Sequence, residues 1–490
     1  FDGRARRRED AGNPELSAFE TDDLSDRKVI VVDRHLLGRQ SSDDHLSGPG
    51  QIAAHERDAV VHEVGAIGDA AEESLPDRID RVARGPRAET HVGPHVDLRR
   101  DRRNAVDFFD RRDIGGDHFA DEIEFGHDYS LLTKLRHAGQ IIYNLPASRD
   151  LQRLIADFNP DVVHAHNVYH HLSPSVLRTA SQAGLPVFLT LHDLKLACPA
   201  YSMISHGAVC EACKDGGVKQ VMLRRCMKGS LALSSLIWIE SMAHRMLDIY
   251  DRSVDRFIVP SRFFIDKFVE WGWPRERFVH VPNFADVGGL KADAPVGRPF
   301  LYFGRLSREK GLYTLIRAAS AAGVSLRIAG AGPDELALKA LVEDLGADVT
   351  FLGFRTGDDL WQEVRQCRAL VLPSEWYENA PISVLEAYAL GKPVIGARIG
   401  GIPEMIVEEQ TGLLYPSASV EALAATLARV SGMSDQQIQA WGLNGRELLD
   451  REYSMPRHVE RLSTLYAAAG AESVVSQFDK DDVEKAGLVK

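Results

Sequence analysis

The stretch ALVLPSEWYENAPISVLEAYALGKPVIGARIGGIPEMI, residues 369–406, decides the fold. Its first apolar run, 369–372, ends in a Pro-Ser pair, as a buried parallel strand ends at the edge of an α/β sheet. After a polar loop, apolar residues recur at helical spacing from position 381 until Gly391, which ends the helix. A second apolar run, 393–397, follows. The order of strand, loop, helix and strand predicts a parallel α/β sheet.

Two carboxylates in this unit are unusually placed. Glu378 lies in the polar loop, and Glu386 falls on the apolar side of the predicted helix. A buried carboxylate needs polar partners, and the hydroxyls of a ligand would serve, although Glu386 could also be simply solvated. The backbone N–H groups of residues 379–382 would form an anion site at the helix start. Residues 400–404, GGIPE, repeat that arrangement one strand later.

Residues 378–386, ENAPISVLE, resemble the E-x7-E motif of the family-4 glycosyltransferases, which are retaining enzymes with the GT-B fold. Four other segments resemble landmarks of that family in their usual order: 304–311 (GRLSREKG), 328–333 (IAGAGP), 351–354 (FLGF) and 411–415 (TGLLY). The resemblance covers residues from about 121 to 470. It implies an α/β protein of two Rossmann-like domains that face each other across a cleft, with a nucleotide sugar bound to the second domain.

Charge explains why such a site needs cations. Transfer from a nucleotide sugar leaves a diphosphate whose negative charge grows as the glycosidic bond breaks. Arg305 offers a planar fork to two oxygens and Lys310 a compact charge. The other interpretation is two exposed basic residues after a strand. The neighbouring glycines, Gly304 among them, favour the donor-binding role.

The resemblance also implies individual roles. Glu378 is catalytic and holds hydroxyls of the donor sugar, while Glu386 holds the ribose hydroxyls. The backbone near Gly353 and Phe354 contacts the base. The amides of Asn379 and Ala380 help to hold the sugar or phosphate. The family retains the anomeric configuration without a required metal, and the diphosphate helps to take the proton of the acceptor.

Before this domain, strands and helices alternate from about residue 122. His192 and Asp193 follow the predicted strand 186–191, at the edge where open α/β sheets bind ligands. In the family, a histidine here lies near the transferred sugar, so His192 is the second catalytic candidate. His164 and His166 are predicted to be structural histidines.

Four cysteines, Cys198, Cys210, Cys213 and Cys226, come soon after His192. The C-x2-C pair has the spacing of zinc ligands, so a structural zinc site is one expectation. The alternative is a loop that contains buried free thiols. Both interpretations assume a reducing compartment, which five cysteines and the absence of a recognisable signal peptide favour. We therefore expect a cytoplasmic protein.

Residues 1–120 differ from the rest of the chain. They contain 45 charged residues, with 18 Arg against one Lys, and lack Met, Tyr, Trp and Cys. This composition predicts either a disordered extension or a segment translated from a wrong frame, and we favour the second. The sequence KVIVVD, 28–33, could pass as a strand, but no glycine-rich loop follows it. That loop faces the donor phosphates in the family, so the activity of this chain is itself in question.

The predicted organisation follows from these observations. The boundaries are 1–120 for the anomalous segment, 121–290 for an acceptor-side domain, 291–457 for a donor-binding domain, 458–475 for a helix returning to the first domain, and 476–490 for a tail. A net charge of −13 and a pI near 5.8 argue against nucleic acid as a partner. The most apolar stretch, 231–239, is too short to span a membrane and is predicted to be a core helix.

The function expected from the sequence is transfer of a hexose from a UDP- or GDP-linked sugar to a glycan or lipid-linked acceptor, in surface polysaccharide synthesis. Two alternatives stay open: a catalytically dead nucleotide-sugar-binding protein, and an epimerase or phosphorylase of the same fold. A hydrolase with paired carboxylates fits poorly, because Glu378 and Glu386 serve separate hydroxyl pairs. Peripheral membrane contact also stays open, although no amphipathic segment stands out.

Overall fold

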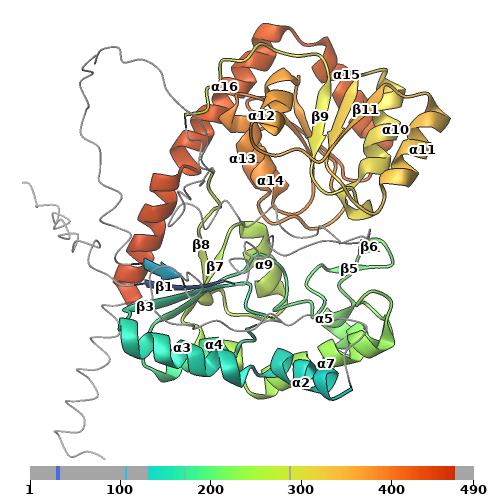
Figure 1. The fold of residues 1–490 in the computed structure, drawn as a ribbon. Coiled ribbons are helices and arrows are strands. Elements are labelled where there is room, and N and C mark those ends of the chain that lie inside the picture. Colours follow the sequence, from blue (N-terminus) through green and yellow to red (C-terminus); the bar gives the residue numbers. More distant parts are fainter. Residues whose placement is uncertain (1–28, 34–104, 108–130, 170–171, 286–288, 470–490) are drawn as a thin grey trace, which may run out of the picture.

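Two lobes, each built around one parallel sheet, make up the part of the chain that the structure describes (Figure 1). The structure is a computed structural model, and it describes residues 29–33, 105–107, 131–169, 172–285 and 289–469. The predicted fold class is confirmed. The predictions for the remainder of 1–120 and for the tail 476–490 concern residues outside the described part.

The sheet of the second lobe has six parallel strands in the order β11-β10-β9-β12-β13-β14. Their bounds are β9 Phe300–Phe303, β10 Leu326–Ala329, β11 Val349–Gly353, β12 Leu370–Leu372, β13 Val394–Ala397 and β14 Gly412–Tyr415. β12 and β13 are fully buried, as their uninterrupted apolar sequences predict. Because the strands are parallel, their carboxyl ends all reach one edge of the sheet, and the polar loops of this lobe meet there.

Helices cover both faces of this sheet. They are α10 Leu312–Ala322, α11 Glu335–Leu345, α12 Gly357–Gln366, α13 Ile382–Ala389, α14 Ile402–Met405, α15 Val420–Gly432 and α16 Asp435–Glu452. α10 packs against α15 on one side and α13 against α16 on the other. After α13 the chain turns at Gly391, whose φ of 67° is in the left-handed region that glycine adopts readily.

The sheet of the first lobe is also parallel, in the order β2-β1-β3-β4-β7-β8. Its strands are β1 Val29–Asp33, β2 Ala105–Asp107, β3 Val162–His166, β4 Val187–Thr190, β7 Arg256–Val259 and β8 Phe278–His280. β1 and β2 precede residue 121, so the first sheet is not confined to 121–290, and the segment 28–33 that could pass as a strand does form one. The physical reason is local: Ile30 and Val32 are completely buried beside β3.

The helices of the first lobe are α2 Leu131–Ile142, α3 Leu145–Phe158, α4 Ser175–Gln182, α5 Ala212–Gly216, α6 Gln220–Leu223, α7 Leu231–Met246, α8 Ile249–Ser253 and α9 Arg262–Glu270. The stretch 231–239 is helical as predicted, and Ile237 belongs to the core of this lobe, but the helix is not buried as a whole. Several of the large apolar side chains of α7, Leu231 and Ile239 among them, are exposed to solvent. Within the described residues, no helix is both long and apolar enough to cross a bilayer.

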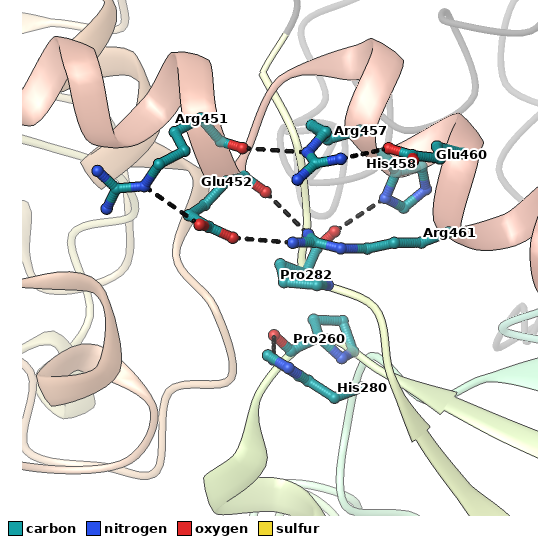
Figure 2. Close-up of polar contacts among 9 residues, drawn as sticks. All are labelled: Pro260, His280, Pro282, Arg451, Glu452, Arg457, His458, Glu460 and Arg461. Atoms are coloured by element: carbon teal, nitrogen blue, oxygen red, sulfur yellow. Dashed lines mark hydrogen bonds and ion pairs between the residues drawn. The ribbon is translucent and has the colours of Figure 1, made fainter. Parts of the chain in front are cut away.

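The end of the described chain returns from the second lobe to the first. α16 ends at Glu452, the chain bends at residues 453–454, and a helix continues over 455–469. Leu462 and Tyr466 of this helix pack on the first sheet. At the bend, Arg461 donates hydrogen bonds to the Glu452 carbonyl at 2.8 Å and to its carboxylate at 2.9 Å, and His458 contacts the Pro282 carbonyl at 2.8 Å (Figure 2). The lobes are therefore joined at a polar hinge.

Candidate functional site

Glu378 and Lys310 form a largely buried ion pair at the carboxyl edge of the second sheet. Lys310 Nζ lies 2.8 Å from Glu378 Oε1, and Ser374 Oγ donates to the same oxygen at 2.6 Å. The ammonium also lies 4.9 Å from the centre of the Trp376 ring, which adds a cation–π contact. The two residues that the sequence assigned to sugar hydroxyls and to phosphate are therefore in direct contact.

Two opposing effects set the charge of Glu378. Burial alone would raise the pKa of its carboxyl, but the charge and hydrogen bond of Lys310, together with the Ser374 hydroxyl, hold that pKa below its usual range. Glu378 is therefore a carboxylate at neutral pH. A carboxylate with further lone pairs can accept hydrogen bonds from the hydroxyls of a ligand.

Glycine is required next to Lys310 because two loops cross there. Gly311 has a φ of 71°, and a Cβ at this position would lie 1.8 Å from the carbonyl oxygen of Pro373. This close approach brings the 304–311 segment onto the loop that carries Ser374 and Glu378. Gly330 likewise allows a close approach to the start of the 304–311 segment, because a Cβ at this position would lie 1.9 Å from the Gly304 carbonyl oxygen. The glycines of the motifs are thus contact points between loops.

Arg305 lies just after β9 at the same edge. Its side chain is exposed and makes no hydrogen bond or ion pair with the described residues, while its carbonyl accepts a hydrogen bond from Tyr302 OH at 2.8 Å. Gly353 ends β11, Phe354 follows it, and the Phe354 ring is 55% exposed. A cation and an aromatic face are therefore presented to solvent at the carboxyl ends of β9 and β11, which are separated in the sheet by β10.

Glu386 lies in α13 and is half-buried. It is therefore neither fully buried nor fully solvated, which were the two alternatives that the sequence left open. At 400–404, where the sequence predicts a second anion site, the glycines contact the Glu378 loop. The Gly401 N–H donates to the Glu378 carbonyl at 2.8 Å, and a Cβ on Gly400 would lie 2.4 Å from that oxygen. The Gly401 N–H is therefore engaged within the protein, and both glycines support the Glu378 loop.

His192 faces this edge from the first lobe. Its Nε2 lies 3.0 Å from Nδ1 of His166, and the two rings stack with centres 5.3 Å apart. Burial and the neighbouring His164 and His192 hold the pKa of His166 well below its usual range, so this ring is neutral. His166 was predicted to be only structural. Its two-residue spacing from His164 places both rings on the same face of β3. Nothing in the sequence identified His192 as the partner of His166.

His164 agrees with the structural interpretation. Its ring nitrogens contact Tyr466 OH at 2.6 Å and Thr190 Oγ1 at 2.7 Å. Burial lowers its pKa to about 3, with smaller contributions from His458 and His192. A neutral, doubly hydrogen-bonded His164 ties the returning helix to the strand that leads to His192.

Asn379 connects the two lobes. Its Nδ2 donates to the carbonyl oxygens of Leu191 at 3.1 Å and His192 at 3.3 Å, and its Oδ1 accepts from Ser261 Oγ at 2.7 Å. The residue next to Glu378 is thus hydrogen-bonded to the backbone of His192. Ala380 is joined to the first lobe as well, because its carbonyl accepts from Asn283 Nδ2 at 3.0 Å.

Glu404 makes a second connection that the sequence did not predict. Its carboxylate accepts from the backbone N–H of Arg262 at 2.9 Å and of Phe263 at 2.6 Å, at the start of α9. A carboxylate is favoured there by the unpaired amides and dipole of the helix N-terminus. Nothing in the sequence indicated that the first backbone N–H groups of α9 would be bound by a carboxylate from the other lobe.

A cavity of about 610 Å³ lies beside these connections, on the side of the hinge. Its walls include Ser261, His280, Glu404 and Arg461, and Figure 2 shows His280 and Arg461 near the bend of the terminal helix. Burial and the nearby Arg262 lower the pKa of His280 to about 4. Arg305, Lys310 and Glu378 do not line this cavity.

The cysteines do not form the predicted zinc site. Among the described residues, no group of three or more His, Cys, Asp or Glu side chains is arranged to hold a metal ion. Cys198 is buried, the other three are half-buried, and all four are free thiols. Burial raises the pKa of Cys198 to about 12 and of Cys213 to about 11, which disfavours the thiolate that zinc requires.

Comparison with known proteins agrees with this architecture. Residues 296–447 match the family described as glycosyl transferases group 1, and residues 124–283 match the glycosyl transferase 4-like domain. The chain therefore belongs to the group 1 glycosyltransferases, which have the GT-B fold.

Three proteins illustrate how far the similarity extends. An uncharacterized 42.6 kDa protein in the cps region of Klebsiella pneumoniae is 27% identical over 266 residues, 54% of this chain and 64% of its own length. The amylovoran biosynthesis glycosyltransferase AmsK of Erwinia amylovora is 29% identical over 191 residues, 35% of this chain and 46% of its own. This chain thus matches less than two thirds of either relative.

The third is a solved structure, HepE of Anabaena in complex with UDP and glucose. It superposes with a TM-score of 0.51 at 17% identity and covers 76% of this chain and 88% of its own. This similarity shows that the two proteins share a fold.

Proposed function

We propose that this protein is a retaining hexosyltransferase that moves a hexose from a nucleotide-diphosphate sugar to a glycan or lipid-linked acceptor, in the synthesis of a surface polysaccharide. The observation that carries the proposal is the 2.8 Å ion pair of Lys310 and Glu378, joined through Asn379 to the backbone of His192. AmsK, a relative, takes part in amylovoran biosynthesis, and HepE binds UDP and glucose. Both support this choice of substrates.

The donor is held by charges at one edge of the second sheet. Arg305 and Lys310 bind the diphosphate, Glu378 accepts hydroxyls of the hexose, and Glu386 accepts those of the ribose. Gly353 and Phe354 contact the base. When the bond between the anomeric carbon and the diphosphate oxygen breaks, its electron pair goes to the diphosphate, and the two fixed cations stabilise the added charge without reorganising.

The acceptor approaches from the first lobe. Its hydroxyl oxygen forms the new bond to the anomeric carbon on the face that the diphosphate leaves, and its proton passes to the departing diphosphate. His192, held by His166, contacts the transferred hexose. This chemistry requires no metal. The free cysteines fit a reducing cytoplasm, where nucleotide sugars would be available at the inner face of the membrane.

Calorimetric titration of the full chain with UDP and with GDP tests the donor site. We expect one of the two nucleotides to bind, and the Arg305→Ala variant to lose most of that binding, because a charge-assisted contact to the diphosphate is removed. The identity of the bound nucleotide would name the base of the donor.

Three outcomes are distinguishable. Binding with turnover of the corresponding nucleotide sugar supports a transferase. Binding without turnover on any glycan or lipid-linked acceptor favours a nucleotide-sugar-binding protein. If neither UDP nor GDP binds, the donor site is not functional in this chain and the proposal fails.

Replacing Asn379 by Asp is expected to lower kcat/KM about tenfold or more. The substitution keeps the shape of the side chain but places a carboxylate opposite the carbonyl oxygens of Leu191 and His192, so two hydrogen bonds of about 1 kcal/mol each are lost and repulsion is added. The measurement is steady-state kinetics combined with calorimetric binding of the donor nucleotide.

Ser261→Ala is the control, because it removes the contact to Asn379 Oδ1 and the helix-capping contact to the Phe264 N–H but leaves both carbonyl contacts of Asn379 in place. We expect its kcat/KM to stay within about threefold of the wild type. Equal losses in the two variants would contradict a positioning role for the Asn379 amide.

A further inference from the structure

The outward face of α7 is apolar, which is the reverse of the usual arrangement in a surface helix. Leu231, Ile239, Met242 and Met246 are 51%, 47%, 37% and 79% exposed. With Ser235 they recur every three or four residues, so they share one face of the helix. Leu223, at the end of α6, is 61% exposed as well. We call these five apolar side chains the α7 stripe.

Polar contacts on the inward face hold α7 in this orientation. Glu240 Oε2 lies 2.8 Å from Lys195 Nζ, and both side chains are buried. His244 Nε2 contacts the Ile142 carbonyl at 2.8 Å. Rotating the helix to bury the stripe would break these contacts and leave the buried Lys195 ammonium without its charged partner, which is strongly unfavourable. The exposure of the stripe is therefore built into the lobe.

Basic residues flank one end of the stripe. Residues 214–228 contain Lys214, Lys219, Arg224, Arg225 and Lys228 against one acid, Asp215, and all five cations are exposed. This local excess stands in a chain whose net charge is −13. Apolar side chains beside a cluster of cations complement a bilayer of anionic lipids, with hydrocarbon inside and negative headgroups at its surface.

We propose that α6, α7 and the preceding basic segment dock this protein on an anionic lipid surface. α7 has 16 residues, about 24 Å of helix, so it lies along the membrane and does not cross it. A second copy of the chain is a poorer occupant. A symmetric dimer through this face would bring two clusters of like charge close together, whereas interface cores are depleted of charge.

Docking also orients the site. Lys195, which Glu240 of α7 holds, follows His192 by three residues, so the docking helix lies behind the loop that carries His192. α7 packs against α2 and α6, and Figure 1 shows it on the side of the first lobe away from the second lobe. This part of the inference rests on the proposed function, since it places a lipid-linked acceptor near the first lobe. The docking itself does not depend on that function.

Co-sedimentation of the full chain with vesicles, without any nucleotide, tests the docking. We expect binding to vesicles that contain phosphatidylglycerol and much weaker binding to phosphatidylcholine alone. The double variant Ile239→Ser with Met246→Ser should bind the anionic vesicles about tenfold or more weakly, because two apolar side chains no longer enter the bilayer. Lys219→Ala with Arg224→Ala should weaken binding by about 30-fold, at about 1 kcal/mol for each charge.

Leu336→Ser is the matched control, because Leu336 is an 83% exposed leucine on α11 of the other lobe. It should bind vesicles like the wild type. Wild-type protein that binds neither vesicle, or an Ile239/Met246 variant that binds unchanged, would overturn the proposal. So would light scattering that shows a dimer which this variant converts to a monomer. Nucleotide titration of the same variants separates a failure of docking from a failure of the donor site.

Discussion

Replacing Arg305 by alanine is expected to lower kcat about 100-fold or more, the loss that follows removal of one preorganised donor to a developing negative charge. The side chain is exposed at the carboxyl end of β9 and has no partner among the described residues that the substitution would leave unpaired. The stability of the fold should therefore hardly change. Initial rates with the donor sugar that the calorimetry identifies provide the measurement.

Arg308→Ala is the matched control within the same loop. Arg308 is also exposed, but its guanidinium lies 5.4 Å from the centre of the Tyr313 ring, on a local aromatic contact. We expect this variant to keep kcat within threefold of the wild type. Arg305→Lys should fall between the two, because it keeps the charge but loses the planar fork that binds two oxygens. An Arg305→Ala enzyme within threefold of the wild type would refute the role.

Local patterns were sufficient to predict most of the second lobe. β12 and β13 differ from the predicted strands 369–372 and 393–397 by a residue at one end, because short apolar runs bounded by Gly or Pro leave little choice of structure. β1 was harder to identify. The apolar residues of 28–33 are few and are surrounded by a highly charged sequence, and pairing with β2 and β3, both distant in the chain, makes them a strand.

The same contrast between local patterns and distant contacts applies to the residues of the candidate site. The motif predicted that Glu378 and Lys310 would act together, since each matched a family landmark. Contacts made across the gap between the lobes could not be predicted. Asn379 was assigned by its backbone amide, yet its side chain reaches 187 residues back along the chain to His192. The orientation of α7 was missed because its sequence is apolar on most sides, and buried contacts with residues distant in sequence, those of Glu240 with Lys195 and of His244 with Ile142, decide which side faces inward.

Lys310→Met is expected to destabilise the second lobe by about 3 kcal/mol, the usual cost of removing one partner from a buried ion pair. The exposed fractions of the Lys310 and Glu378 side chains are 24% and 9%, so water can relieve little of the loss. Burial is then opposed mainly by the hydrogen bond from Ser374, and the pKa of Glu378 should move above its usual range. Chemical unfolding of both proteins at neutral pH measures the difference.

The pH dependence gives an independent test of the same pair. In the wild type the pKa of Glu378 is lower in the folded than in the unfolded state. Its contribution to the free energy of unfolding is therefore fully present above the unfolded pKa of about 4.3, and is lost as the pH falls through the folded value. In Lys310→Met the sign reverses, so this carboxyl should favour folding on acidification. Thermal unfolding midpoints at neutral pH and near pH 4 should thus differ less in the variant than in the wild type.

A double-mutant cycle separates stability from catalysis at this pair. Adding Glu378→Gln to Lys310→Met removes the unpaired buried charge, so it should restore much of the lost stability but none of the activity, because the carboxylate and the cation are then both absent. Glu378→Gln alone leaves a lysine that water can still reach, and should destabilise less than Lys310→Met. If the two single effects on stability simply add, Lys310 and Glu378 are not coupled, and the ion pair is not what holds the donor edge together.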